Sequence, residues 1–202
     1  MSSGKQPMII QGNDPAVEAS FSLGNRLARA VWGTVWLLLF RTSPRPFHRW
    51  RALLLRLFGA TLGRHVHVYP GVRVWAPWQL RIGDRVGIAD GAIIYNMAMV
   101  SIGSNTTISQ GAHLCCGSHN IDSSNFQLVT APIVLGSHVW ICAEAFVAPG
   151  VSVAEGCVVG ARAVLTKTIA EPWSVWVGNP AVPKRKRRIA SADNGSLGTD
   201  PH

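Results

Sequence analysis

The sequence of 202 residues is poor in charge, and in acidic residues above all. Charged side chains make up 14% of it, and 19 lysines and arginines outnumber 10 acids. An average domain has roughly 25% charged residues. Because hydrophobic residues reach 48%, the chain can bury a core, which excludes disorder as its main state. The length predicts one domain, or a compact domain with an appendage.

Long apolar runs are also lacking. The longest one near the start, residues 30–40, has eleven residues, whereas a membrane-spanning helix needs about 20. The first twenty residues do not show the basic start, apolar block and small-residue cleavage site of a secretory signal. The sequence therefore predicts a cytoplasmic protein in which no segment crosses a membrane.

Cysteine is scarce as well. The four cysteines stand at positions 115, 116, 142 and 157, and none forms a C-x-x-C pair. This spacing does not match a zinc site or a small disulfide framework. The sequence predicts reduced, partly buried cysteines, as in proteins of a reducing compartment.

The cations that are present gather toward the two ends of the chain. Ten arginines and no acid lie between Glu18 and Asp84, and residues 184–188 are five consecutive cations. Residues 86–183 hold two cations and five acids. This distribution predicts two surfaces for anionic partners beside a nearly neutral body. Nucleic acid is not expected, because no aromatic residues alternate with the terminal cations as a stacking platform requires.

The sequence is rich in a repeat of six residues. An aliphatic residue occupies every sixth position from Leu135 to Leu165, and similar sets with slips in register run through residues 82–114 and, more loosely, 62–74. A period of six is neither 2 nor 3.6, so it favours short strands separated by turns and stacked coil upon coil. About five such coils fit between residues 62 and 170.

The repeat pattern [LIV]-[GAS]-x-x-[STAV]-x resembles that of the hexapeptide-repeat acyltransferases. The resemblance implies a mainly β fold, a left-handed parallel β-helix of triangular section. Longer segments such as TISQGAHLCCGSHNID (107–122) and VTAPIVLGSHVWICAEAFVAPGV (129–151) are similar to the colanic acid biosynthesis acetyltransferases. That group is related to the maltose and galactoside O-acetyltransferases, and the similarity runs from about Phe21 to Lys184.

The resemblance implies an O-acetyltransferase that moves acetyl from acetyl-CoA to a sugar hydroxyl of an exopolysaccharide precursor or glycan. It also implies a homotrimer with active sites between neighbouring chains. His119 stands just before residues 120–134, which interrupt the repeat, and matches the family's general base. An imidazole can remove a hydroxyl proton during attack on a thioester. Cys115 and Cys116 are alternative nucleophiles, and Glu144 or Asp122 could orient the imidazole.

The same resemblance assigns residues to the two substrates. The acetyl-CoA set is Trp140, Ala143, Ala161, Thr166, Lys167 and Arg185. Related enzymes carry an acceptor-side asparagine where this chain has Ala89, so the expected acceptor contacts are Tyr95 and Asn96 instead.

Two other functions stay open. The γ-type carbonic anhydrases share this solenoid and bind zinc through histidines of two subunits, for which His113, His119 and His138 are the candidates. The six-residue spacing places His113 and His119 on adjacent faces. A non-catalytic β-helix scaffold is the other alternative. The acetyltransferase interpretation expects no metal.

The repeat divides the chain into four parts. We expect a disordered N-terminus (1–20), a helical cap (21–60), the β-helix with its extruded loop (61–183) and a basic tail (184–202). In the cap, apolar residues from Leu23 to Leu39 recur at helical spacing, the run from Ser43 to Pro46 ends that helix, and a second helix spans 47–58. Arginines and tryptophans in the cap predict contact with an anionic membrane at its cytoplasmic face.

Overall fold

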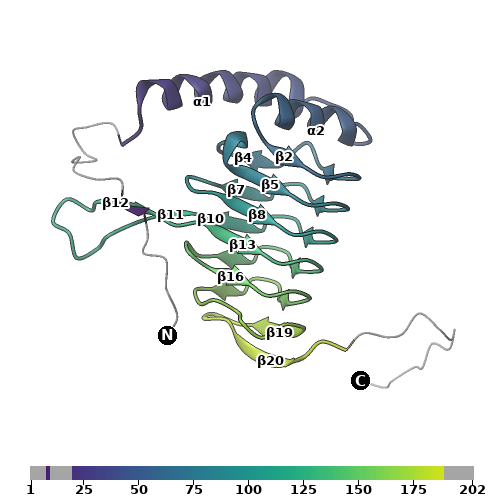
Figure 1. Cartoon of the computed structure of the whole chain (residues 1–202), viewed down its shortest axis with the longest axis vertical. Helices are drawn as coiled ribbons and strands as arrows, with labels where there is room; N and C mark the ends of the chain where they lie inside the picture. The colour runs from purple at the N-terminus through teal and green to yellow at the C-terminus, as the bar shows by residue number, and fades with distance from the viewer. Residues whose placement is uncertain (1–7, 10–19, 189–202) are drawn as a thin grey trace, which may run out of the picture.

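The structure, a computed structural model, describes residues 8–9 and 20–188. Its body is a column of stacked coils with two helices across one end (Figure 1). Strand β1 (Met8–Ile9) lies within the N-terminal segment that the sequence predicts to be disordered. The rest of that segment up to residue 19, and the tail beyond residue 188, fall outside the described ranges.

The coils place their strands in three parallel sheets, which form the three faces of the column. The first face consists of β2 (Thr61–Leu62), β5 (Leu80–Ile82), β8 (Val100–Ile102), β13 (Ile133–Leu135) and β16 (Ser152–Val153). The second face consists of β3 (His67–Val68), β6 (Gly87–Ile88), β9 (Thr107–Ile108), β14 (Trp140–Ile141), β17 (Val158–Val159) and β19 (Ser174–Val177). The third face consists of β4 (Arg73–Val74), β7 (Ile93–Tyr95), β10 (His113–Cys115), β15 (Phe146–Val147) and β18 (Val164–Leu165).

The register of these sheets confirms the six-residue repeat. In the first face Ile82 pairs with Ile102, Ile102 with Leu135, and Leu135 with Val153, so each repeat aliphatic lies above its counterpart. All four side chains are buried in the core, and burial of an aliphatic side chain contributes roughly 1.5–3 kcal/mol. Five coils are complete, as predicted, and the bridge from Val153 to Ile169 together with β19 adds a partial sixth.

Glycine in the repeat has a steric cause at the edge between the first and second faces. A Cβ atom on Gly103 would lie 2.5 Å from the carbonyl carbon of Gly136 in the next coil. A Cβ on Gly83 would lie 2.8 Å from the backbone nitrogen of Ser104. Neighbouring coils therefore approach so closely here that a side chain at these positions would collide with backbone.

The predicted cap consists of two helices. Helix α1 (Leu23–Val35) starts where the Ser22 hydroxyl accepts a hydrogen bond from Asn25, and continues as a π-helical turn, Trp36–Phe40. Helix α2 (His48–Leu57) follows. The indole nitrogens of Trp32 and Trp36 donate to the carbonyl oxygens of Val74 and Val72, at 2.7 and 2.8 Å. These bonds and the buried Trp32 ring fasten α1 to the first coil.

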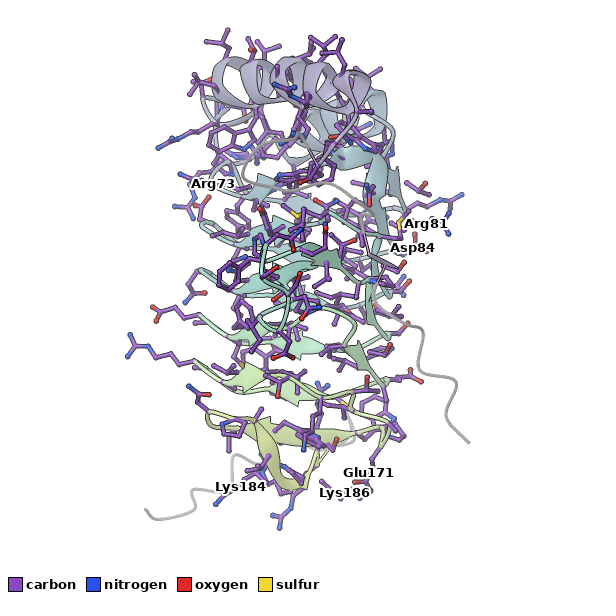
Figure 2. The ribbon with its side chains drawn as sticks, turned by 90° about the vertical axis from the view of Figure 1, so that its left-hand side faces the viewer. Arg73, Arg81, Asp84, Glu171, Lys184 and Lys186 are labelled. Carbon is purple, nitrogen blue, oxygen red and sulfur yellow. The ribbon has the colours of Figure 1, made fainter. Side chains whose placement is uncertain are left out.

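Most of the aliphatic stripe that predicts this helix faces solvent, although Val35 packs partly against the core. Leu23, Leu27, Val31 and Leu38 are 56–68% exposed. The cap in Figure 2 carries many side chains that project away from the coils. Among the described residues, no helix combines the length and apolarity that a membrane span requires.

Candidate active site

An extruded hairpin carries the predicted base. Strands β11 (Gly117–His119) and β12 (Leu128–Thr130) leave the column after β10 and return to it before β13 (Figure 1). β1 pairs with the outer edge of β12, which gives a three-stranded antiparallel sheet. The excursion begins at residue 117, three residues before the predicted loop, because 117–119 pair with 128–130. His119 therefore lies on the hairpin itself and not at the end of a coil.

The imidazole of His119 is oriented by the backbone. Its Nδ1 lies 2.6 Å from the carbonyl oxygen of Phe126, across the hairpin. A carbonyl oxygen only accepts hydrogen bonds, so Nδ1 carries the proton and the lone pair of the neutral ring is at Nε2. The side chain is exposed to solvent. Nε2 can therefore accept a proton from a bound molecule.

Neither carboxylate considered from the sequence supplies the bond that orients His119. Glu144 pairs with Arg162 at 2.6 Å, on the edge between the second and third faces. Asp122 lies in the hairpin turn, where its backbone nitrogen donates to Asn120. The orienting group is a main-chain oxygen, which any residue at position 126 would provide. No side-chain motif could have revealed it.

The two cysteines beside the hairpin are poor nucleophiles. Cys116 is fully buried, and burial raises the pKa of its thiol to about 12. Burial also raises the pKa of Cys115, whose thiol donates to the Gly117 carbonyl oxygen at 3.2 Å. Because the thiolate is the reactive form, these surroundings favour direct transfer over an acyl-cysteine intermediate.

The two residues predicted to contact the acceptor differ in their surroundings. Tyr95 pairs with Cys115 in the third face, one strand from the start of the hairpin. Its ring lies 6.2 Å from that of Trp75, and burial raises the pKa of its hydroxyl. Asn96 is fully buried, and its amide bonds only to backbone atoms of Ala76 and Gln79. This geometry favours a structural role for Asn96 over the predicted acceptor contact.

The residues predicted for acetyl-CoA divide between two edges of the column. Trp140, Ala143 and Ala161 lie on or just after the second face. Thr166 and Lys167 follow β18 of the third face, on the same edge as the hairpin but two coils further along. A single chain therefore does not place His119 beside the Trp140 group.

These residues are nevertheless open to a ligand. The Trp140 side chain is 46% exposed, and its indole nitrogen donates to Ser109 at 2.9 Å. Lys167 is exposed, and within the part of the chain that the structure describes its amino group forms no hydrogen bond or ion pair. Arg185 lies exposed in β20 (Val182–Lys186), which pairs antiparallel with β19 at the far end of the column.

The three histidines considered as zinc ligands lie apart. His113 is in the third face, His119 on the hairpin, and His138 on the edge between the first and second faces. Across residues 8–9 and 20–188, no group of three or more His, Cys, Asp or Glu side chains is placed to hold a metal ion. His138 instead bonds to Asn105 at 3.2 Å.

Comparison with known proteins agrees with this geometry, although no protein-family profile matches the chain. The chain is 40% identical over 172 residues to the Escherichia coli K12 protein named as colanic acid biosynthesis acetyltransferase WcaF, covering 85% of this chain and 94% of that protein. A galactoside acetyltransferase solved with coenzyme A is 25% identical with a TM-score of 0.77, over 84% of this chain and 86% of the other. A maltose O-acetyltransferase from Clostridium difficile 630 has a TM-score of 0.76 at 22% identity, over 83% and 90%.

The three-faced column with its extruded hairpin, and these likenesses, define a hexapeptide-repeat acetyltransferase built on a left-handed parallel β-helix. The fold that the resemblance implies is thereby confirmed. The chain belongs to the family of the colanic acid biosynthesis acetyltransferases.

Proposed function

We propose that the protein transfers the acetyl group of acetyl-CoA to a hydroxyl of a sugar, in an exopolysaccharide precursor or glycan, with His119 as general base. The observation that carries the proposal is the 2.6 Å contact from Nδ1 of His119 to the Phe126 carbonyl, which leaves the Nε2 lone pair free. The family and the coenzyme A complex of the similar galactoside acetyltransferase support the choice of donor.

The proposed reaction is a direct transfer. Nε2 removes the acceptor hydroxyl proton while the hydroxyl oxygen attacks the carbonyl carbon of the thioester. A C–O bond forms and the C–S bond breaks. The departing thiolate takes the proton from Nε2, so that the products are the acetylated sugar and free coenzyme A. Tyr95, one strand from the hairpin, is the proposed acceptor contact.

We infer that the active site is completed in a homotrimer. His119, Thr166 and Lys167 share one edge of the column, while Trp140, Ala143 and Ala161 surround another. If all six touch one acetyl-CoA molecule, the two sets must come from neighbouring chains. Rotational symmetry would then generate equivalent sites between adjacent columns. Arg185 is assigned to the phosphate end of the cofactor.

The activity is tested by release of free thiol from acetyl-CoA. Purified protein is incubated with nucleotide sugars, oligosaccharides and lipid-linked glycans in turn, and the products are analysed for an acetyl ester. Thiol release that depends on one acceptor class, with an ester on that sugar, is the expected result. If the protein binds coenzyme A but releases no thiol with any acceptor, the non-catalytic scaffold is favoured instead.

We also propose that the cap rests on the cytoplasmic face of an anionic membrane. The support is its exposed aliphatic stripe, represented by Leu27 and Leu38, together with seven arginines and no acid in residues 19–60. Exposed apolar side chains enter the headgroup region while arginines attract anionic lipids.

Vesicle co-sedimentation tests this contact. The double variant Leu27→Gln/Leu38→Gln should bind anionic vesicles about tenfold more weakly. Val182→Gln is the matched control, because Val182 is an exposed aliphatic residue of β20 at the opposite end of the column. Equal binding by the double variant and the control would rule out the stripe as the contact surface.

A further inference from the structure

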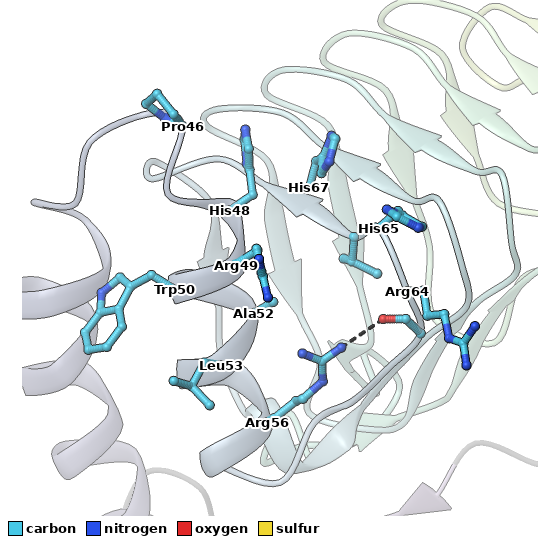
Figure 3. A pocket seen from close by; sticks show the side chains of 12 residues that line it. Pro46, His48, Arg49, Trp50, Ala52, Leu53, Arg56, Arg64, His65 and His67 are labelled. Carbon is cyan, nitrogen blue, oxygen red and sulfur yellow. Dashed lines mark hydrogen bonds between the residues drawn. The ribbon is translucent and has the colours of Figure 1, made fainter.

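A cleft of about 1020 Å³ lies between α2 and the start of the first coil (Figure 3). It is lined by elements that carry none of the residues assigned to acetyl transfer. Its wall contains no acid. Six basic side chains line it: His48, Arg49, Arg56, Arg64, His65 and His67. A concave surface with cations from two separate elements is suited to an anion.

A buried arginine adds charge from behind this wall. Arg51, in α2, has no exposed surface, and its partners include the carbonyl oxygens of Val68 and Pro44 at 2.6 and 2.8 Å and the Ser43 hydroxyl at 2.7 Å. No carboxylate among the described residues forms an ion pair with it. Its Nη2 atom lies 3.2 Å from the ring of His48. Its direct partners are neutral groups, and the negative charge of Asp90 acts on it from further away. Because low-dielectric surroundings screen a charge weakly, the guanidinium still adds positive charge near the cleft.

The acids nearest to the cleft are already engaged. Asp84 accepts a hydrogen bond from the Arg64 backbone nitrogen at 2.6 Å. Asp90 pairs with Arg45 at 3.4 Å and accepts from the Gly71 nitrogen at 2.8 Å. Neither carboxylate lines the cleft. The wall of the cleft therefore presents cations and no carboxylate to a bound molecule, and Asp84 lies behind Gly63 and Arg64.

Two of the arginines that line the cleft are free to bind a ligand. Arg56 donates to the carbonyl oxygens of Leu62 and Gly63, at 3.2 and 2.9 Å, which fixes one end of the wall. Arg49 and Arg64 are exposed, and within residues 20–188 their guanidinium groups form no hydrogen bond or ion pair. A guanidinium fork matches the oxygens of a phosphate group.

The cleft is bordered on one side by apolar surface. Trp50 and Leu53 line it and are 38% and 45% exposed, and Leu57, one turn further along α2, is 70% exposed. The Trp50 indole donates to the carbonyl oxygen of the exposed Leu39 at 3.0 Å, so this border meets the apolar surface of the cap. A ligand that fits both the basic wall and the apolar border carries an anionic group and a hydrocarbon chain.

We propose that this cleft binds the phosphate head group of an anionic lipid, with the first part of the acyl chain against Trp50 and Leu53. Arg49 and Arg64 hold the phosphate, and the field of Arg51 supports them. The site rests on the membrane contact proposed for the cap and gives that contact a defined lipid. It is separate from acetyl transfer at His119.

Calorimetric titration with a soluble lipid tests the site on the full-length protein. Dihexanoyl phosphatidic acid below its micelle concentration is the probe, with dihexanoyl phosphatidylcholine and glycerol 3-phosphate for comparison. We expect phosphatidic acid to bind to the unmodified protein. The Arg64→Gln variant should bind it about tenfold more weakly, because a charged hydrogen bond is lost. The Arg81→Gln variant, which changes an exposed arginine of β5 that does not line the cleft, should bind as the unmodified protein does.

The outcomes separate the alternatives. Equal affinity of Arg64→Gln and Arg81→Gln for phosphatidic acid would overturn the site. Glycerol 3-phosphate binding as tightly as phosphatidic acid would overturn the lipid and leave a free-phosphate site. The Leu27→Gln/Leu38→Gln variant should keep its affinity for the soluble lipid even where it loses vesicles. These measurements therefore distinguish failure of the lipid-site proposal from failure of the proposed membrane contact.

Discussion

Nδ1 of His119 and the backbone carbonyl oxygen of Phe126 lie 2.6 Å apart across the extruded hairpin. The register of the hairpin, in which His119 pairs with Leu128, brings them together. The proposed base therefore has its tautomer set by the main chain of its own loop. Catalysis should depend on the shape of the hairpin and not on a carboxylate partner.

Cysteine chemistry should make no contribution to turnover. At pH 7 a thiol with the pKa of Cys116, about 12, is ionised to about one part in 10⁵. We expect Cys115→Ala and Cys116→Ala to retain kcat within about twofold. Cys116→Ala should also lose about 1 kcal/mol of stability, since it removes a buried side chain. A loss of turnover in Cys115→Ala comparable to that of a missing base would point to an acyl-cysteine.

Coil stacking should be sensitive to a single methyl group at the edge between the first and second faces. Gly103→Ala should destabilise the protein by about 1–3 kcal/mol, because its Cβ would meet the backbone of the next coil. Gly87→Ala is the control, since a Cβ there meets nothing within 4 Å. Thermal unfolding followed by circular dichroism measures both variants. Equal melting temperatures for the two variants would mean that the coils can move apart at this edge to accommodate the added methyl group.

The sequence predicted the solenoid well because its signal is periodic. Each aliphatic residue such as Ile102 meets an equivalent residue one coil away, so one spacing repeated many times gives the whole column. The helices of the cap were predictable for the same reason. Their outer face was not, because the periodic spacing of Leu23 and Leu27 shows a stripe but not the direction in which it points.

The site was less predictable than the fold. A histidine before an interruption marks the base, yet the partner of His119 is a backbone atom that the sequence does not encode in a side chain. The role of Asn96 depends on burial against Ala76, a contact between neighbouring coils. The cleft beside α2 arises from residues of two separate elements, and each arginine in its wall, taken alone, is an ordinary surface cation.

Lys167 should contribute to affinity for acetyl-CoA and not to chemistry. As an exposed lysine without an ion pair in the described chain, it is free to meet a phosphate of the donor. Lys167→Gln should raise the KM for acetyl-CoA about fivefold with kcat unchanged, and the effect should shrink as salt rises. Steady-state kinetics at two salt concentrations measure this. An unchanged KM at low salt would remove Lys167 from the site.

Mixing two inactive variants should restore activity if neighbouring chains share a site. His119→Ala damages the base, and Ala161→Trp blocks the proposed acetyl-CoA contact on a different edge of the column. Chains of the two variants, unfolded together in equal amounts and reassembled, should recover about a quarter of the unmodified activity. This is the fraction of interfaces in which both the base and the acetyl-CoA contact are intact. Each variant reassembled alone is the control. No recovery in mixed trimers, or a fully active monomer in sedimentation, would contradict the shared site.

The turnover rate of the His119→Ala variant is the most direct test of the proposed mechanism. Removal of a positioned base should lower kcat by about 10² to 10⁴, with the KM for acetyl-CoA and the melting temperature close to those of the unmodified protein, because the ring is exposed. His138→Ala, an exposed histidine on another edge, should keep full activity. Full turnover in His119→Ala would contradict the assignment of the base and with it the proposed mechanism.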